Sequence, residues 1–463
     1  MIPGDGARTR GATLVQGGVT DARVAAADIL ADLRGGELLD AAFDRRVREL
    51  DARDRRWTQE LVYGTLRRRG VLDAILTERV RGGLARLDAD LTDILRLGIY
   101  QLLHMGSVPP YAAIAQSVEL AKRRHGIGAS KLANAVLRRV DRERGDDAFT
   151  ALPRPPDPVE ALALAGSHPQ WLVARWAARW GLEEATRLVE LNNTEAPLCI
   201  RPYGIVHEQL EAMLEEAGVH VDDAPFVHDG LCITSHPALA DLGAFRQGLF
   251  FVQDPAATLV TQYASVPEGA TVIDLCAAPG GKSLELSRVA SLVIACDRSP
   301  ARLERMRQNV ERLDARNVVL VATDARETAL SPVDAVLVDA PCTGTGTFRR
   351  HPDARWRLKA SDLAVSAAAQ RAILRSAASL VRPGGLMIYS TCSLEAEENE
   401  RQVEAFLAAH PEWTLDPPPG GTVADAVLDG GMLRVLPQRH GVDGAFAARL
   451  RRSAGRSAGR SAA

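Results

Sequence analysis

One segment of the chain indicates the architecture of its C-terminal half: Val272-Ile273-Asp274-Leu275-Cys276-Ala277-Ala278-Pro279-Gly280-Gly281-Lys282-Ser283. Its apolar beginning predicts a buried strand, and the small residues, the proline and the two glycines that follow predict a tight turn. An apolar period through Leu284, Leu286 and Val289 then predicts a helix. The glycines would let a ligand approach the backbone, and the first turn of the helix would offer free N–H groups. We therefore predict a nucleotide-type pocket at this turn.

The end of this segment, Gly281-Lys282-Ser283, also matches the end of a Walker phosphate loop. That loop requires a glycine five residues before Gly281, where this chain has Cys276. The dinucleotide fingerprint G-x-G-x-x-G is absent from the segment as well. The pocket is therefore expected to use a different loop from either motif.

Asp274, Asp297, Asp324 and Asp339 each end an apolar run that predicts a strand. In doubly wound α/β folds, ligands bind at the carboxyl ends of the parallel strands, and an acid after the second strand accepts hydrogen bonds from ribose hydroxyls. Asp297 lies sixteen residues after Gly281, which suits that role. A single strand-end aspartate would most simply cap a turn or a helix. Four of them favour a binding site along one edge of a sheet.

Two cysteine motifs narrow the class of protein. Cys342 ends the sequence Asp339-Ala-Pro-Cys, and Cys392 stands in Ser390-Thr-Cys-Ser after a fifth predicted strand. With the turn at residues 276–282, these motifs resemble those of S-adenosylmethionine-dependent RNA cytosine-5 methyltransferases. Over residues 20–452 the chain resembles the bacterial RsmB (Fmu/Sun) type of the RsmB/NOP family, whose members modify 16S ribosomal RNA.

The resemblance implies that the cofactor S-adenosylmethionine binds at the turn and the strand ends. The implied cofactor-binding residues are Cys276, Ala277, Ala278, Pro279, Gly280, Gly281, Lys282, Asp297, Asp324 and Asp339. The turn would surround the methionine part of the cofactor, Asp297 would hold the ribose, and Asp324 would lie on the adenine side. No metal is expected.

Methylation of cytosine at C5 requires a thiolate, a carboxyl group and a base. A thiolate that adds to C6 makes C5 nucleophilic, an acid stabilises the charge that builds at N3, and a base removes the C5 proton. The residues alone do not decide which of the two cysteines attacks. By resemblance to the RNA enzymes, we assign Cys392 as the nucleophile, Cys342 as the residue that assists release, and Asp339 as the partner of N3.

The composition limits the classes of protein that the chain can form. With 463 residues, of which 46% are hydrophobic, it is long enough for two or three domains. The formal net charge of −3 gives no general attraction to nucleic acid. No apolar run reaches the length of a membrane span, so we expect a cytoplasmic protein without membrane contact. The six cysteines show no paired metal-binding spacing, and reduced thiols are expected.

The rest of the chain is predicted to form a multidomain protein. Helical apolar spacing predicts an all-α region at residues 19–145, where residues 59–67 and 134–140 resemble the NusB-like RNA-binding domain. The further predicted segments are disordered ends at 1–18 and 453–463, a linker at 146–163, a small α+β RNA-recognition subdomain at 164–250, and an α/β Rossmann-like methyltransferase core at 251–452.

Three details of these regions stay open. The basic residues of the helical region could contact phosphates or form a solvated surface: Lys122, Arg123, Arg124, Lys131, Arg138 and Arg139. Asp254 precedes Pro255 and could cap a helix or border the cofactor. Arg201-Pro202-Tyr203 departs from the Arg-Val-Asn that the family often carries, which leaves the role of that strand end open.

The chain is therefore expected to transfer a methyl group from S-adenosylmethionine to C5 of a cytidine in 16S ribosomal RNA, through a covalent cysteine–C6 intermediate. A monomer is expected, with RNA rather than DNA as its partner, either naked or within an assembling small subunit. The alternatives are a non-catalytic RNA-binding or ribosome-assembly factor, and a methyltransferase for another RNA such as tRNA, for DNA or for protein. The intact turn and both cysteines disfavour the first alternative. The Thr-Cys motif and the NusB-like region disfavour DNA or protein as the substrate.

Overall fold

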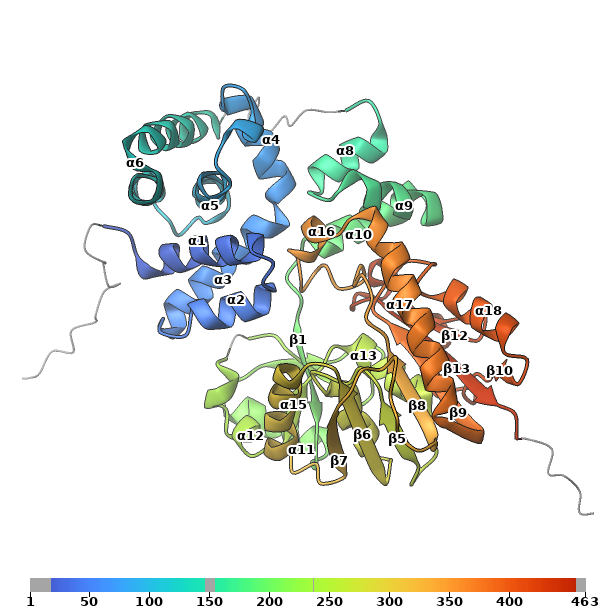
Figure 1. The fold of residues 1–463 in the computed structure, drawn as a ribbon. Helices are drawn as coiled ribbons and strands as arrows, with labels where there is room; N and C mark the ends of the chain where they lie inside the picture. The colour runs from blue at the N-terminus through green and yellow to red at the C-terminus, as the bar shows by residue number, and fades with distance from the viewer. Residues whose placement is uncertain (1–17, 146–154, 236, 455–463) are drawn as a thin grey trace, which may run out of the picture. The chain divides into compact units, whose positions relative to one another are not determined.

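The computed structural model describes residues 18–145, 155–235 and 237–454. Within it the chain forms two compact units (Figure 1). The first unit comprises Met1–Asn193 with His351–Trp356, and the second comprises Thr194–Arg350 with Arg357–Ala463. The segments predicted to be disordered lie outside the described residues except at their inner ends, as does the first part of the predicted linker.

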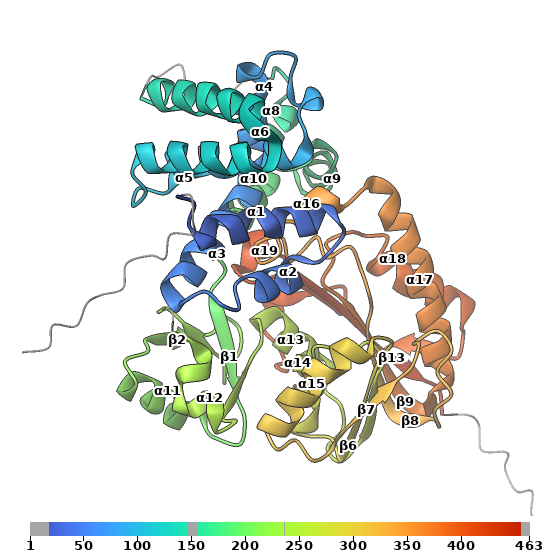
Figure 2. The ribbon, with the colours of Figure 1, turned by 60° about the vertical axis from the view of Figure 1, so that its left-hand side comes forward.

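The first unit is helical, as the apolar spacing predicts. Its helices are α1 (Asp21–Arg34), α2 (Leu39–Arg46), α3 (Ala52–Arg67), α4 (Arg69–Arg79), α5 (Ala89–His104), α6 (Pro110–Glu143), α8 (Pro158–Ala165), α9 (Gln170–Trp180) and α10 (Leu182–Asn192), with a short 3-10 turn, η1 (Leu84–Arg86). The apolar faces of α1 to α6 meet in one core, which includes Leu61, Leu95 and Leu137. Helices α5 and α6 lie side by side in both views (Figures 1 and 2).

Local sequence signals determine where these helices begin. Asp88 caps α5 because its carboxylate accepts the N–H groups of Asp90 at 2.8 Å and Leu91 at 3.3 Å. Asp157 caps α8 in the same way, with Pro158 at its first position. Helix α8 therefore begins inside the predicted linker, which is shorter than the proline content suggests.

A short segment distant in sequence, His351–Trp356, completes the first unit. The Trp356 indole N–H donates to the Leu66 carbonyl oxygen at 2.8 Å, and the Arg69 guanidinium lies over the Trp356 ring. Arg355 is fully buried in the same unit, where it donates to the Asn192 carbonyl oxygen at 2.9 Å and the Asn193 side chain at 2.9 Å. Burial lowers the pKa of Arg355 to about 9. No pattern in the sequence predicts that this segment packs with the helices.

The second unit begins with a small α+β subdomain. Its elements are β1 (Leu198–Pro202), α11 (His207–Glu216), β2 (Val221–Asp223), β3 (Leu231–Ile233), η2 (Leu239–Asp241), α12 (Gly243–Arg246) and β4 (Phe250–Val252). The strands form an antiparallel sheet in the order β2-β3-β1-β4. Ile200, Leu210 and Phe250 pack together in its core.

Strand β1 contradicts one sequence expectation, the reduced state of its cysteine, and answers an open question about its end. Cys199 faces Cys232 of β3 across the antiparallel pair, with their Cα atoms 4.0 Å apart, and the two form a disulfide rather than reduced thiols. The pairing of strands far apart in the sequence could not be read from the cysteine spacing. Directly after β1, the hydroxyl of Tyr203, a residue that departs from the family pattern, lies 3.0 Å from the Ser287 hydroxyl and so packs within this unit.

The larger part of the second unit is a mixed sheet with helices beside it. Its elements are α13 (Pro255–Ala264), β5 (Thr271–Asp274), α14 (Gly281–Ser287), β6 (Leu292–Asp297), α15 (Pro300–Arg312), β7 (Val318–Ala322), β8 (Val333–Asp339), α17 (Ala360–Ser379), β9 (Val381–Thr391), α18 (Glu400–Ala409), β10 (Trp413–Leu415), η3 (Asp425–Val427), β11 (Leu428–Asp429), β12 (Met432–Val435), α19 (Pro437–His440) and β13 (Ala445–Arg452). Helix α16 (Ala354–Arg357) lies mostly in the first unit. The strand order is β11-β12-β13-β9-β8-β5-β6-β7, and β10 pairs with β13. The strands from β5 to β9 are parallel, whereas β13 runs antiparallel to β9. Helix α17 lies along β8 and β9, and α18 packs beside α17 (Figure 1).

Strand β9 begins at Val381, and the sequence Pro383-Gly384-Gly385 lies inside a bulge of the strand. One strand end differs from the predicted one. Strand β7 ends at Ala322, which leaves Asp324 in the loop beyond it. Among the described residues, no helix combines the length and the apolar character that a membrane span requires.

Candidate active site

The strand order brings the predicted site residues to one edge of the sheet. Strand β5 lies between β8 and β6, and all three are parallel, so their carboxyl ends share one side. Asp274, Asp297 and Asp339 are the last residues of β5, β6 and β8. Strand β9 ends beside them at Thr391, directly before Cys392. This edge is where open parallel sheets bind their ligands.

The turn after β5 requires its glycines. Gly280 has a φ of +109°, a conformation that favours glycine, and a side chain there would approach Met306 to 2.8 Å. A side chain at Gly281 would collide with the side chain of Gln253. Because the backbone is bare here, a ligand can approach it closely.

The side chain of Asp274 holds this turn in place. Its carboxylate is buried and accepts the Ser283 hydroxyl at 2.6 Å, which ties β5 to the start of α14. Burial raises the pKa of Asp274 to about 7, although the bond from Ser283 opposes the shift. Asp274 therefore ties the turn to β5 and changes its charge near neutral pH.

Asp339 is held by two side chains from neighbouring elements. One carboxylate oxygen accepts the Lys282 ammonium at 2.8 Å, and the other accepts the Ser390 hydroxyl at 2.9 Å. Burial opposes a charge on Lys282, but the Asp339 carboxylate outweighs it and raises the pKa of Lys282. Asp339 is thus a fixed carboxylate at the junction of β8, β9 and the glycine turn.

The two predicted catalytic cysteines lie in contact. The Sγ atoms of Cys342 and Cys392 are 3.3 Å apart, and both side chains are half-buried. The hydrogen bond with Cys392 and burial raise the pKa of Cys342 well above its usual range. Cys342 is therefore a thiol that keeps its proton. Burial and the nearby Asp274 likewise raise the pKa of Cys276. The thiol of this cysteine in the turn therefore also keeps its proton.

The acids after β6 and β7 differ in their surroundings. Asp297 is buried, accepts the Ser299 N–H at 2.9 Å and pairs with Arg302 at 3.0 Å. Asp324 is partly exposed and pairs with Arg326, whose hydrogen bond lowers the pKa of that carboxyl. Asp297 has the burial and the place at a strand end that a ribose partner needs, whereas Asp324 lies in the loop beyond β7.

Arg350, which the sequence reasoning missed, fastens the loop after Cys342. Its guanidinium donates to Asp254 at 2.6 Å and to Asp443 at 2.8 Å. The other Asp254 oxygen accepts the Ala256 N–H at 2.8 Å, so Asp254 is the cap of α13. Burial raises the pKa of Asp443 to about 7, with the charge of Asp254 acting in the same direction. The basic pair in Phe348-Arg349-Arg350 was the only signal of this network in the sequence.

The basic residues of the helical unit are partly neutralised. Arg124 pairs with Asp28 and with Asp90, which lies 3.0 Å from it. Acids one helical turn away pair with three further members: Lys122 and Arg123 with Glu119, and Arg139 with Glu143. Lys131 and Arg138 are exposed, and no ion pair of either is found among the described residues. The face is therefore less positive than its sequence suggests.

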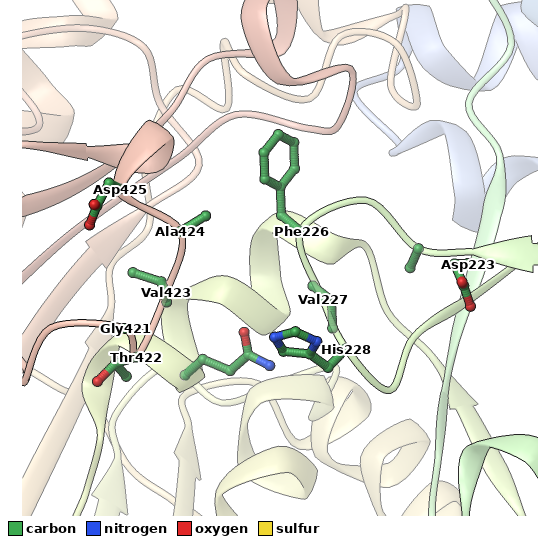
Figure 3. A pocket seen from close by; sticks show the side chains of 11 residues that line it. Asp223, Phe226, Val227, His228, Gly421, Thr422, Val423, Ala424 and Asp425 are labelled. Atoms are coloured by element: carbon green, nitrogen blue, oxygen red, sulfur yellow. The ribbon is translucent and has the colours of Figure 1, made fainter.

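A cavity of about 580 Å³ opens elsewhere in the second unit. Residues 223–228 form one wall and residues 421–425 form the other (Figure 3). Its eleven lining residues include Asp223, His228 and Asp425 but no lysine or arginine. The cavity therefore does not suit a phosphate group, and it contains none of the predicted site residues.

The parallel sheet, the glycine turn after its first strand and the acids at one edge define a Rossmann-like methyltransferase core. Comparison with known proteins narrows this class to a family. Residues 262–451 match the family model described as 16S rRNA methyltransferase RsmB/F, residues 20–142 match the NusB family, and residues 168–239 match the ferredoxin-like domain of RsmF/B-like methyltransferases.

Individual relatives cover nearly the whole chain. The ribosomal RNA small subunit methyltransferase B of Pseudomonas putida is 33% identical over 92% of this chain and 98% of its own length. The enzyme of the same name from Vibrio cholerae is 34% identical over 92% of this chain and 99% of its own length. The crystal structure of PH0851 superposes with a TM-score of 0.80 and 26% identity, covering 95% of this chain and 100% of that one.

The chain belongs to the RsmB/F family of 16S rRNA methyltransferases. This confirms the predicted fold class, with a NusB-like helical domain, a ferredoxin-like subdomain and a Rossmann-like core. It also confirms S-adenosylmethionine as the cofactor, because the family depends on it.

Proposed function

We propose that the chain methylates C5 of a cytidine in 16S ribosomal RNA through a covalent bond between Cys392 and C6 of the base. The contact between Cys342 and Cys392, with Sγ atoms 3.3 Å apart, carries this proposal. C5 methylation needs both a nucleophile at C6 and a group that acts after the transfer, and two adjacent thiols beside a carboxylate supply them.

The surroundings of the two cysteines support the roles that we assign to them. Cys342 keeps its proton because the hydrogen bond with Cys392 and burial disfavour its thiolate. This supports the assignment of Cys392 as the nucleophile. Its thiolate donates an electron pair to C6, the electrons of the C5–C6 double bond shift to the bond between C5 and C4, and negative charge builds at N3. The Asp339 carboxyl would deliver a proton to N3, and Lys282 with Ser390 keeps that carboxyl in place.

S-adenosylmethionine, when bound, supplies the methyl group. The turn at Cys276–Lys282 would hold its methionine part, Asp297 its ribose and Asp324 its adenine side, with Asp339 nearby. After methylation, C5 carries a proton that must leave together with the bond to Cys392. Water would take the C5 proton, the electrons of the C5–H bond would restore the C5–C6 double bond, and the electron pair of the C6–S bond would return to Cys392. Cys342 lies where its thiol can assist by donating a hydrogen bond to the departing sulfur.

The remaining parts of the chain are proposed to deliver the RNA. The NusB-like unit, residues 19–145, and the subdomain at 164–250 would position ribosomal RNA, with the methyltransferase core at 251–452. We propose that a monomer acts in the cytoplasm on RNA rather than DNA, as naked RNA or within an assembling small subunit.

Mapping of 5-methylcytosine in ribosomal RNA tests the proposed function. A strain without this protein should lack 5-methylcytosine at one position of 16S ribosomal RNA. The wild-type chain should restore that methylation, and the Cys392→Ala chain should not. Unchanged 5-methylcytosine in the deletion strain, or restoration by Cys392→Ala, would contradict the proposal.

A further inference from the structure

A buried glutamate holds the residue next to Cys342. The Glu398 side chain is fully buried, and one of its oxygens accepts the Thr343 N–H at 2.9 Å. The other oxygen accepts the Thr343 hydroxyl. Glu398 does not reach the sulfur itself, but it fixes both the backbone and the side chain of the next residue.

Gln370 holds the residue on the other side of Cys342. Its buried amide nitrogen donates to the Pro341 carbonyl oxygen at 3.0 Å and to Glu398 at 3.1 Å. The segment Pro341-Cys342-Thr343 is therefore bonded at both ends, with Cys342 between the two attachments. Three donors, counting the amide of Gln370, satisfy the Glu398 carboxylate, as a buried charge requires.

The neighbouring residue, Asn399, holds the other cysteine in the same manner. Its side-chain oxygen accepts the Thr391 hydroxyl, and its side-chain nitrogen donates to the Ser393 carbonyl oxygen at 2.8 Å. These two residues flank Cys392. Asn399 is buried, and like Glu398 it touches the neighbours of a thiol rather than the thiol.

We propose that Glu398 and Asn399 are positioning residues that separately place the two thiols, Glu398 through Thr343 for Cys342 and Asn399 through Thr391 and Ser393 for Cys392. Two consecutive residues before α18 thus fix two loops that leave different strands of the sheet. The inference rests on the proposed function, because it assigns each residue to one step of that reaction. Asn399 serves the attack on C6, and Glu398 serves the release.

Glu398 also acts on Cys342 through its charge. Beyond the hydrogen bond with Cys392 and burial, the Glu398 carboxylate contributes to the raised pKa of Cys342. A neutral glutamine keeps an acceptor for the Thr343 N–H but removes the charge. Glu398→Gln should therefore lower the pKa of Cys342, which a loss of packing alone would not do.

Alkylation of the thiols by iodoacetamide, followed by mass spectrometry of each cysteine peptide, tests this without RNA. For Cys342 in the full-length protein, the midpoint of alkylation rate against pH should fall in Glu398→Gln, so that alkylation is faster below the midpoint. Glu404→Gln, the same change at an exposed position of α18, is the matched control and should keep the wild-type midpoint. An unshifted midpoint in Glu398→Gln, or an equal shift in Glu404→Gln, would overturn the assignment of Glu398 to Cys342.

Thr343→Val separates the placement of Cys342 from the effect of the Glu398 charge. It also replaces Glu398→Gln in the test if that variant does not fold. It removes the hydroxyl that Glu398 holds but keeps the carboxylate, so the midpoint should stay while release becomes slow. With 16S ribosomal RNA and S-adenosylmethionine, Thr343→Val and Glu398→Gln should accumulate a protein–RNA adduct. Asn399→Ala should form the adduct slowly. Release at the wild-type rate in Thr343→Val would overturn the positioning role of Glu398.

The Cys342→Ala chain tells a failure of this inference from a failure of the proposed function. If Cys342→Ala accumulates the adduct and neither Thr343→Val nor Glu398→Gln does, the positioning inference is wrong. If Cys342→Ala accumulates none, the assignment of the cysteines is wrong, and the pH dependence of Cys342 alkylation still decides whether Glu398 acts on that thiol.

Discussion

Cys342 and Cys392 carry Sγ atoms 3.3 Å apart, although fifty residues separate them in the sequence. The contact follows from the parallel pairing of β8 with β9, in which Asp339 lies opposite Ser390. Each strand continues into a loop, and each loop places its cysteine within three residues of that pair. The same pairing lets the Ser390 hydroxyl reach Asp339, so the carboxylate and both thiols form one site.

Replacement of Asp297 should weaken cofactor binding. Asp297→Ala removes a buried carboxylate at the end of β6, and loss of its charge-assisted bonds should cost about 1–3 kcal/mol, or roughly 5- to 150-fold in Kd. Isothermal titration with S-adenosylmethionine measures the change. Asp314→Ala, at an exposed position beyond α15, should bind as the wild type does. Equal affinity in both variants would contradict the role of Asp297.

Loss of Lys282 should impair the reaction through Asp339. Lys282→Met removes the ammonium that lies 2.8 Å from that carboxylate and leaves only the Ser390 hydroxyl to hold it. We expect the rate of methyl transfer to fall by at least about tenfold, because a misplaced carboxyl no longer meets the charge at N3. Single-turnover methylation measures this rate. A wild-type rate would show that the pair is structural only.

Asp274 should make the stability of the protein depend on pH. Burial raises its pKa from 3.8 to about 7 in the folded chain, so the folded state retains a proton that the unfolded state has lost. The stabilisation is complete below about pH 4 and is lost as the pH rises through 7, by up to ~4 kcal/mol. Asp274→Asn should lack this loss. The test measures the free energy of unfolding of the wild type and of Asp274→Asn between about pH 4 and pH 8. A difference between the two proteins that does not change with pH would contradict the prediction.

The exposed basic residues of the helical unit should contribute to RNA binding, in contrast to those paired with acids. Lys131→Ala and Arg138→Ala should each weaken binding of 16S ribosomal RNA and lower its salt dependence by about one unit of slope if each meets a phosphate. Cofactor affinity should not change. Filter binding at several salt concentrations measures the slope. Unaltered slopes in both variants would show that this face is a solvated surface.

The sequence predicted the parts of the molecule that depend on short segments. The strand that ends in Asp274, its glycine turn and the next helix are local features, and the acids at the other strand ends followed from the same pattern. The family resemblance then supplied the roles assigned to the cysteines of the two motifs. The burial of Asp297 agrees with its predicted place, whereas Asp324 lies in a loop because β7 ends at Ala322, the last residue of the apolar run.

Contacts between distant segments could not be read in this way. Glu398 bonds Thr343 fifty-five residues away, and Trp356 bonds Leu66 at a separation of 290 residues. The disulfide joins Cys199 to Cys232 because two antiparallel strands place them opposite each other, a register that their spacing does not reveal. Such pairings depend on the tertiary arrangement, and no local pattern in the chain announces them.

The central claim is that Cys392 attacks the base and Cys342 assists release. Denaturing electrophoresis with labelled 16S ribosomal RNA, S-adenosylmethionine and the two single-cysteine variants tests it most directly. In Cys342→Ala, attack and methylation should proceed while release is impaired, so a covalent protein–RNA band should accumulate. In Cys392→Ala, no such band and no methylation should be found, because nothing attacks C6. A band that forms in Cys392→Ala and is absent in Cys342→Ala would contradict the account and reverse the two roles.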